Sequence, residues 1–477
     1  MKLPIAILVL LAFLNLSASV SVGSKAEKKK MVCYYGSWAV YRPGAGKFDV
    51  EDLDPFICTH INQNPELKAI LAIGGWNEGS EKYSKMVSSP SERAKFTNSV
   101  VDFLLKYNFD GLDFDWEYPS NRGGIPADKE NFIYMIEELK AAFSPHGLLL
   151  TAAVSAGKTT IDTAYDVPAM SRILDHIHIM AYDFHGAWED FTGHNSPLYS
   201  NPEIDYGEFA TFNQDYAVNY WLDKGADPSK LVLGMGLYGR GFILSNPANN
   251  GFYASANQPI SAGPYTREPG IWGYNEICEK FAAEPGTWTV VVDPFYMSPY
   301  TYKGNQWMGY DDQDSLKTKA QYAASKGLGG AMVWSVETDD FHGTCHGTPF
   351  ILIKTIYETL NGPIVYPTPP TGEPTQPTVT GPAPTGEFTT GGYSTTKDPR
   401  PTTVTPPPSQ TCQSEGYFPD PNDCGKYYLC VPSGSEWVVY YYECGAGTVF
   451  DPSINNCNFP YNVPGCENYP GKRDVQH

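Results

Sequence analysis

The stretch DGLDFDWEY, residues 110–118, sets four carboxylates among apolar and aromatic residues. Successive side chains of a strand point to opposite faces, so Asp113, Asp115 and Glu117 are expected on one face. Neighbouring like charges raise one another's pKa values, and a general acid needs a carboxyl group that is protonated near neutral pH. A solvated strand face is the alternative. A calcium loop is disfavoured, because Tyr118 stands where an EF-hand beginning at Asp113 needs Gly.

The chain around this stretch alternates β-forming runs with helical patterns. The runs are residues 31–38, 68–76, 111–118, 148–156, 176–184, 231–239 and 329–337. Such repetition predicts a parallel sheet, and so many units in one domain favour a closed (β/α)8 TIM barrel. The segment at about 241–310 is too long for one unit and predicts a small inserted α+β domain.

Polar and aromatic residues lie toward the carboxyl ends of several of these runs, where barrel enzymes keep their active sites. They are Glu117, Tyr182, Asp183, Tyr238 and Trp334.

The ends of the 477-residue chain differ in composition from its middle. Residues 1–23 contain Lys2, an apolar run and small residues, which predicts a secretory signal peptide and a secreted, extracellular protein. Residues 362–410 hold 13 Pro and 13 Thr, so we expect an extended linker. Residues 411–468 form a small cysteine-rich domain.

The ten cysteines predict disulfides in an oxidising compartment. Six of them lie in the small C-terminal domain, which has little core of its own, so three disulfides are expected there. No CxxC pair occurs, and zinc is therefore disfavoured. The cysteines are Cys33, Cys58, Cys278 and Cys345 in the barrel, which can pair locally, and Cys412, Cys424, Cys430, Cys444, Cys457 and Cys466 in the tail.

The formal net charge of −20 disfavours nucleic acid and anionic membrane surfaces as partners, because both reward clusters of Lys and Arg. No later apolar stretch is long enough to span a membrane. Aromatic residues make up 14% of the chain, and flat rings suit the apolar faces of sugars, although most such rings are core residues. Nothing in the sequence indicates a metal, an organic cofactor or an obligate partner, and we expect a monomer.

The motifs together identify a resemblance. FDGLDFDWEYP matches the DxxDxDxE signature of family eighteen glycoside hydrolases, and AIGGWN, MAYDFHGAW, GMGLYGRGF and GAMVWSVETDDF agree with neighbouring strand motifs of that family. Over nearly its whole length the chain resembles an arthropod-type chitinase, with a catalytic domain at 29–361. The cysteine spacing of the tail resembles a peritrophin-type chitin-binding domain. Chitin and chitooligosaccharides are the partners that this resemblance implies.

The spacing of the carboxylates alone leaves their roles open, but the resemblance implies a retaining, substrate-assisted mechanism. It makes Glu117 the general acid and base, Asp115 the group that orients the acetamido N–H, and Asp113 the charge behind it. Asp110, at the entry to the strand, is expected to fix the backbone rather than to take part in the chemistry. Tyr182, counted with the catalytic residues, and Asp183 would hold the acetamido group. The other substrate-binding residues implied are Met180, Trp334, Trp76, Trp38, Trp188 and Arg267.

One interval departs from the family pattern. Only NQNPEL separates FICTHI, the expected second strand, from KAILAIGG, the third. Neighbouring parallel strands need a crossover of a dozen or more residues, usually a helix. The barrel therefore lacks its second crossover helix, through a skipped exon, a misjoined gene model or a rearranged barrel. We expect such a chain to be less stable than a relative with the helix.

The sequence predicts a secreted endochitinase that hydrolyses β-1,4-linked N-acetylglucosamine polymers. The main alternative is a non-catalytic chitin-binding protein, because the barrel is truncated between Ile61 and Lys68. Lectin-like and signalling members of the family lack the acid at the position of Glu117, so its presence disfavours a role of that kind.

Overall fold

The computed structural model describes residues 28–58, 67–364, 416–421, 423–433, 436–443, 449–452, 456–458 and 463–466. The predicted signal peptide and nearly all of the predicted linker lie outside these ranges. The chain divides into two compact units, Met1–Thr371 and Gly372–His477, and each holds sheets of its own.

Seven parallel strands form the main sheet of the first unit, in the order β1-β13-β6-β5-β4-β3-β2. Each of the seven β-forming runs named above overlaps one of these strands. The strands are β1 (Lys30–Cys33), β2 (Ile70–Gly74), β3 (Gly111–Asp115), β4 (Leu149–Ser155), β5 (His176–Met180), β6 (Leu231–Gly236) and β13 (Gly330–Trp334).

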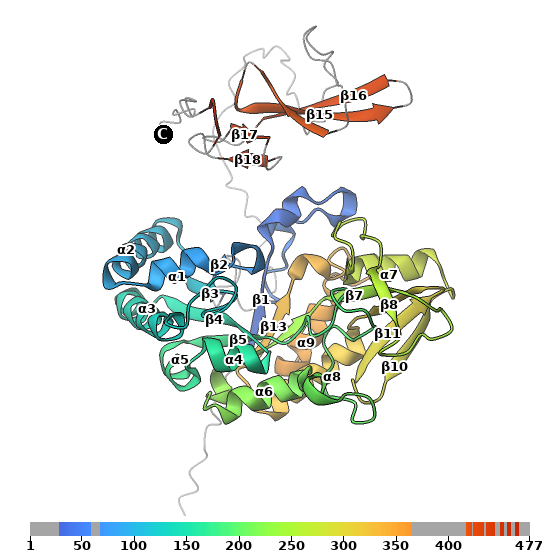
Figure 1. Cartoon of the computed structure of the whole chain (residues 1–477), viewed down its shortest axis with the longest axis horizontal. Helices are drawn as coiled ribbons and strands as arrows, with labels where there is room; N and C mark the ends of the chain where they lie inside the picture. Colours follow the sequence, from blue (N-terminus) through green and yellow to red (C-terminus); the bar gives the residue numbers. More distant parts are fainter. Residues whose placement is uncertain are drawn as a thin grey trace, which may run out of the picture. The chain divides into compact units, whose positions relative to one another are not determined.

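Helices follow the strands and cover the outside of the sheet (Figure 1). In α3 the apolar residues recur at helical spacing from Phe132 to Phe143 and are buried, which is why this segment folds as a helix against the sheet. Phe114 of β3 meets Phe132 edge to face, with ring centroids 5.5 Å apart. The helices of this layer are α1 (Glu81–Val87), α2 (Pro90–Tyr107), α3 (Asp128–Phe143), α4 (Lys158–Ala164), α5 (Val167–Ile173), α6 (Gln214–Asp223), α8 (Gln313–Ser325) and α9 (Ile351–Asn361).

An antiparallel sheet is inserted between β6 and α8. Its strands run in the order β10-β11-β12-β7-β8, and β9 pairs with β7. The predicted α+β insertion is therefore present, although its sheet begins earlier than expected, at Tyr238. Its elements are β7 (Tyr238–Leu244), β8 (Ala256–Pro259), β9 (Ile271–Gly273), α7 (Tyr274–Ala283), β10 (Thr289–Asp293), β11 (Ser298–Lys303) and β12 (Gln306–Gly309).

The strands β1 and β2 are the two edges of the parallel sheet, and among the described residues no strand lies between them. The prediction of a second strand in FICTHI is wrong for its described part, because Phe56–Cys58 forms a turn. A run of β-forming residues becomes a strand only where a neighbour takes up its backbone hydrogen bonds. A disulfide between Cys33 and Cys58 joins the end of β1 to this turn. The short link at residues 59–66 lies outside the described residues.

The edge strand β2 is less buried than the strand beside it. Every residue of β3 is buried, whereas Ala72 of β2 is exposed and the other four β2 residues are only half-buried. Apolar side chains that a closed barrel would cover thus stay in contact with water.

The second unit is a small β structure. It contains β14 (Gly416–Pro419), β15 (Lys426–Ser433), β16 (Glu436–Glu443), β17 (Val449–Asp451) and β18 (Asn456–Asn458). Its described core is slight: Phe450 is buried and stacks on Tyr427 at 4.5 Å between ring centroids. The disulfide Cys424–Cys466 closes the unit, and Cys430 is also disulfide-bonded. Cys457 lies in β18, and Cys412 and Cys444 lie outside the described residues.

The exposed edge generates a prediction about stability. A variant that carries a family strand-and-helix crossover between Ile61 and Lys68 should melt roughly 5 °C or more above the present chain, because burying even two aliphatic side chains contributes several kcal/mol. Thermal unfolding followed by circular dichroism measures the difference. A present chain that melts as high as the restored variant would contradict it.

Candidate active site

The acids of the DxDxE run lie at the carboxyl end of β3. Asp113 and Asp115 are 3% and 8% exposed, and Glu117 follows the strand by two residues and is half-buried. The intervening Trp116 is buried on the opposite side, against Phe132. The alternative of a solvated strand face is therefore wrong.

Asp113 lies deepest and has the most hydrogen-bond partners. The Tyr34 hydroxyl donates to Oδ2 at 2.7 Å, the Thr151 hydroxyl donates to Oδ1 at 2.5 Å, and His178 Nδ1 lies 3.4 Å from Oδ1. Burial alone would raise the pKa of Asp113, but His178 and the two hydroxyls outweigh it, so the pKa lies below its usual range. Asp113 is the ionised member of the group.

Asp115 has the opposite environment. Burial, reinforced by the neighbouring carboxylates Glu117 and Asp113, raises the pKa of Asp115 to about 8. Its Oδ1 atom is buried and has no hydrogen-bond partner among the described residues. At neutral pH this carboxyl group holds a proton that it can donate to a ligand.

Glu117 combines burial with a cation nearby. Burial raises its pKa, a hydrogen bond from Tyr118 and the charge of Arg122 oppose that rise, and Asp183 adds to it. The net direction is upward, which favours the protonated form that a general acid requires.

The glycine motif before Trp76 lets β2 approach the acid strand. Gly74 has φ 120°, and a Cβ there would lie 2.0 Å from the backbone oxygen of Asp115. The N–H of Gly75 donates to that same oxygen at 2.8 Å. Only glycine fits this contact, so the motif fixes where Trp76 leaves the sheet.

A second polar cluster surrounds Asp183, just beyond β5. Its Oδ1 atom accepts hydrogen bonds from the Tyr238 hydroxyl at 2.5 Å and from Arg240 Nε at 2.8 Å. Its N–H donates to Asn195 Oδ1 at 3.0 Å. Tyr182 lies beside this cluster, with its ring 6.2 Å from that of Tyr238.

Large aromatic residues surround the two clusters. Trp334 ends β13 and is half-buried, with its ring 5.8 Å from Tyr34 and 6.1 Å from Trp38. Three other predicted rings project into solvent: Trp38 is 54% exposed, and Trp76 and Trp188 are each 59% exposed. Such exposure is unusual for tryptophan, so these three rings are not part of the core.

Sequence reasoning missed several residues of the site. Tyr34, Thr151 and His178 face Asp113, and Arg240 contacts Asp183. The sequence feature that could have identified these residues is their position, because each lies in or beside a predicted strand. Met180 ends β5, as the motif implied, and Arg267 is exposed in the inserted domain.

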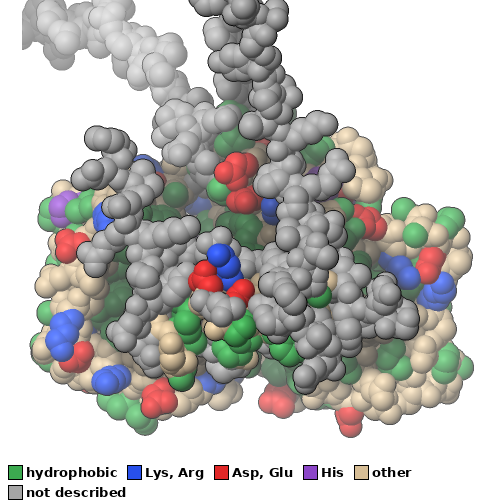
Figure 2. All heavy atoms as spheres, turned by 90° about the horizontal axis from the view of Figure 1, so that it is seen from above, with side chains coloured by type: hydrophobic (Ala, Val, Ile, Leu, Met, Phe, Trp, Pro, Cys, Tyr) green, Lys and Arg blue, Asp and Glu red, His purple; other side chains and the backbone are tan. Residues whose placement is uncertain are grey.

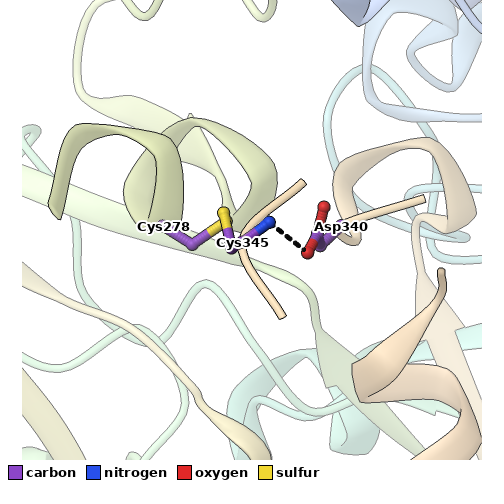
Figure 3. A group of neighbouring side chains, drawn as sticks. All are labelled: Cys278, Asp340 and Cys345. Atoms are coloured by element: carbon purple, nitrogen blue, oxygen red, sulfur yellow. Dashed lines mark hydrogen bonds between the residues drawn. A yellow bond between two sulfur atoms is a disulfide. The ribbon is translucent and has the colours of Figure 1, made fainter. Parts of the chain in front are cut away.

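One group of potential metal ligands occurs among the described residues, namely Cys278, Asp340 and Cys345. Figure 3 shows that the two sulfurs belong to one disulfide, while Asp340 accepts a hydrogen bond from the N–H of Cys345. Sulfurs in a disulfide are not thiolates, so this group is structural.

Lys and Arg side chains on the face drawn in Figure 2 are dispersed among acidic and hydrophobic ones. Each helix in the described part of the chain is too short or too polar to cross a bilayer. The exclusion of nucleic acid stays a prediction.

Comparison with known proteins places these features in a family. The model of glycosyl hydrolases family 18 matches residues 30–339, and the model of the chitin-binding peritrophin-A domain matches residues 412–466. The chain is 37% identical to chitotriosidase-1 of Mus musculus, over 90% of this chain and 95% of that protein. It is 35% identical to an endochitinase of Manduca sexta, over 96% of this chain and 98% of that protein.

A solved structure agrees with this assignment and with the predicted fold class. The Group IV chitinase of Ostrinia furnacalis, in complex with allosamidin, is 42% identical, has a TM-score of 0.67 and covers 70% of this chain and 98% of its own. The chain therefore belongs to glycosyl hydrolase family 18, within its chitinases, and carries a peritrophin-A chitin-binding domain after the catalytic domain.

Proposed function

We propose that the protein is a secreted endochitinase that cleaves β-1,4-linked N-acetylglucosamine polymers with retention at C1. The observation that carries this proposal is the row of three acids at the end of β3, with Asp113 and Asp115 buried and Glu117 half-buried. Ionised Asp113, protonated Asp115 and a Glu117 with a raised pKa stand in order toward the surface. Acids with separated pKa values can share the work of one acid–base cycle.

In the proposed first step, Glu117 gives its proton to the glycosidic oxygen and the bond from C1 to that oxygen breaks. The carbonyl oxygen of the sugar's own acetamido group forms a new bond to C1, which gives a cyclic oxazolinium ion. Glu117, now ionised, removes a proton from water, and the hydroxide opens the ring with the original configuration at C1. The enzyme ends the cycle with Glu117 protonated again.

Asp115 acts on the acetamido group during this cycle. As positive charge develops on the oxazolinium ring, the ionised form of Asp115 becomes favoured, and Asp113 is the adjacent acceptor for its proton. Tyr182 and Asp183 are proposed to hold the acetamido group in place, with Met180 beside them. Asp183 is supported for this role by Tyr238 and Arg240.

The exposed rings support internal cleavage of a long chain. Trp38 lies beside Trp334, Trp76 is linked to the Glu117 loop through Arg122, and Trp188 contacts Arg240 at 4.8 Å. These rings stand on separate loops and are exposed, so they can contact several units of a long polymer. Trp334 is proposed to lie under the sugar that reacts, and Arg267 remains a candidate for a remote contact.

The tail domain is proposed to hold the enzyme on solid chitin. Disulfides in both units fit an oxidising, extracellular setting, and we propose that the enzyme works as a monomer. The open sheet edge favours one rival, a chitin-binding protein whose truncated barrel is catalytically inert.

Replacing Glu117 by Gln should lower the release of N-acetylglucosamine oligomers from colloidal chitin at least about 100-fold, because the amide cannot donate the proton. The melting temperature of the variant serves as the folding control. An unchanged rate would refute the role of Glu117. If neither the parent nor the variant releases sugar while both sediment with chitin, the inert rival is correct.

Asp115→Asn should remove activity yet stabilise the fold in a defined pH window. The pKa of Asp115 rises from 3.8 to about 8 on folding, so the native state keeps a proton that the unfolded chain releases. This contribution to stability is fully present below about pH 4 and is lost as the pH rises toward 8. Asn needs no proton, and since each pKa unit corresponds to about 1.4 kcal/mol, the variant should gain on the order of 5 kcal/mol at pH 7.5.

Thermal melts at pH 4 and pH 7.5 measure this gain. Asp102→Asn, on the exposed side of α2, is the matched control and should melt like the parent at both values. A gain that is equal at the two pH values would contradict the raised pKa.

Truncation after Asn361 tests the tail. The shortened enzyme should hydrolyse soluble N-acetylglucosamine oligomers at the parental rate but should no longer sediment with crystalline chitin, because only local concentration at the surface is lost. Equal sedimentation of the two forms would show that the barrel alone binds the solid.

A further inference from the structure

Arg122 occupies a position that neither the sequence motifs nor the proposed acid–base cycle uses. It lies in the loop between β3 and α3, five residues after Glu117, and its side chain is exposed. One atom, Nη1, donates to the backbone oxygen of Trp76 at 2.9 Å and to that of Glu117 at 3.0 Å. A single guanidinium therefore joins the ends of two neighbouring strands.

The same guanidinium covers one face of the Trp76 indole. Its central carbon lies 3.4 Å from the ring centroid, a close cation–π contact. Trp76 is nevertheless 59% exposed, so the opposite face of the ring is open. A sugar can stack only on that open face, and its orientation is set by the arginine behind it.

Hydrogen bonds to neighbouring residues fix the loop that carries Arg122. The buried Asp128 accepts hydrogen bonds from the N–H of Ile125 at 2.7 Å and from the Ser84 hydroxyl at 2.7 Å. Arg122 itself has φ 49°, in the left-handed region that residues with a side chain seldom adopt. Its carbonyl accepts from the N–H of Ser80 at 3.3 Å. These contacts support an unfavourable conformation at one residue, which is typical of functional loops.

We propose that Arg122 is a positioning residue that holds the Trp76 indole and the Glu117 backbone as one unit, so that stacking of an N-acetylglucosamine ring and proton donation depend on the same side chain. This inference rests on the proposed chitinase function. The inference adds Arg122 to the site, and the charge and the flat shape of its guanidinium have separate effects. The flat face orients the ring, and the charge acts on the acid.

The charge effect has a defined sign. Among the groups that interact electrostatically with Glu117, Arg122 is the cation. The other groups are Tyr118, Asp183, Asp115, Tyr182 and Tyr165. Its charge opposes the rise that burial produces in the pKa of Glu117. Without it the acid would keep its proton to higher pH, so the alkaline limb of kcat/KM should move upward. The shift should be a few tenths of a pH unit, since the guanidinium is exposed and screened.

Two substitutions separate shape from charge. Arg122→Ala should raise KM for an N-acetylglucosamine hexamer roughly two- to five-fold and move the alkaline limb upward, because stacking and charge are both lost. Arg122→Lys should keep the limb near its parental position and recover little of the KM, because an ammonium group cannot lie flat on the indole. Lys95→Ala, which removes an exposed cation on α2, should change neither value.

A double-mutant cycle with Trp76→Ala gives the decisive result. If Arg122 acts on binding through the indole, Arg122→Ala should raise KM no further once Trp76 is absent, while the shift of the limb should persist. An equal rise in KM with and without Trp76, or a limb that does not move, would overturn the proposal.

Binding to the Glu117→Gln protein keeps this test independent of catalysis. In that background Arg122→Ala should weaken hexamer binding by the same two- to five-fold, as measured by tryptophan fluorescence or calorimetry. A parent chain without hydrolytic activity would refute the proposed function and leave this binding test intact. Unchanged hexamer affinity in an active enzyme would refute the role of Arg122 alone.

Discussion

The buried charge on Asp113 is the constraint on which the rest of the site depends. A carboxylate in the middle of a barrel is stable only with hydrogen-bond donors in fixed places, and the donors come from beside β1 (Tyr34), from β4 (Thr151) and from β5 (His178). The three contacts fix how these strands lie against β3. With the charge satisfied at Asp113, the next carboxyl group outward must stay neutral, since two buried anions this close cannot both be ionised. The ionised state of Asp113 thus explains why the next carboxyl group toward Glu117, that of Asp115, keeps its proton.

Much of this arrangement could be predicted from the sequence, because its signals are local. Alternation in DGLDFDWEY placed the acids on one face, and repeated β and α patterns gave the seven strands. The role of Asp110 in fixing backbone is confirmed by its bond from the N–H of Ala69. Residues such as His178 and Arg240 were missed because their function comes from contacts across strands, which no short motif records. FICTHI was wrongly predicted as a strand for a related reason. Strand formation depends on pairing with a neighbouring strand, and the local sequence does not specify that neighbour.

The site is built where the local structure is least relaxed. Asp183 and Arg122 both adopt left-handed backbone conformations, and a buried oxygen of Asp115 lacks a partner. Each feature disfavours the folded state when considered alone, and each lies within the machinery proposed to meet substrate. The surrounding barrel, with its interior of buried aliphatic residues and its helices outside, supplies the stability that makes such positions tolerable.

The disulfide between Cys33 and Cys58 gives the open edge of the sheet a dependence on redox conditions. It closes a loop with a sequence separation of 25 residues. In the chain-entropy model such a crosslink contributes about 3 to 4 kcal/mol by restricting the unfolded chain. That amount is similar to what burial of two aliphatic side chains supplies, so oxidation offsets much of what the shortened crossover removes. Folding of this barrel should consequently depend on an oxidising environment, and a chain kept under reducing conditions would fall short of the stability that its sheet edge requires.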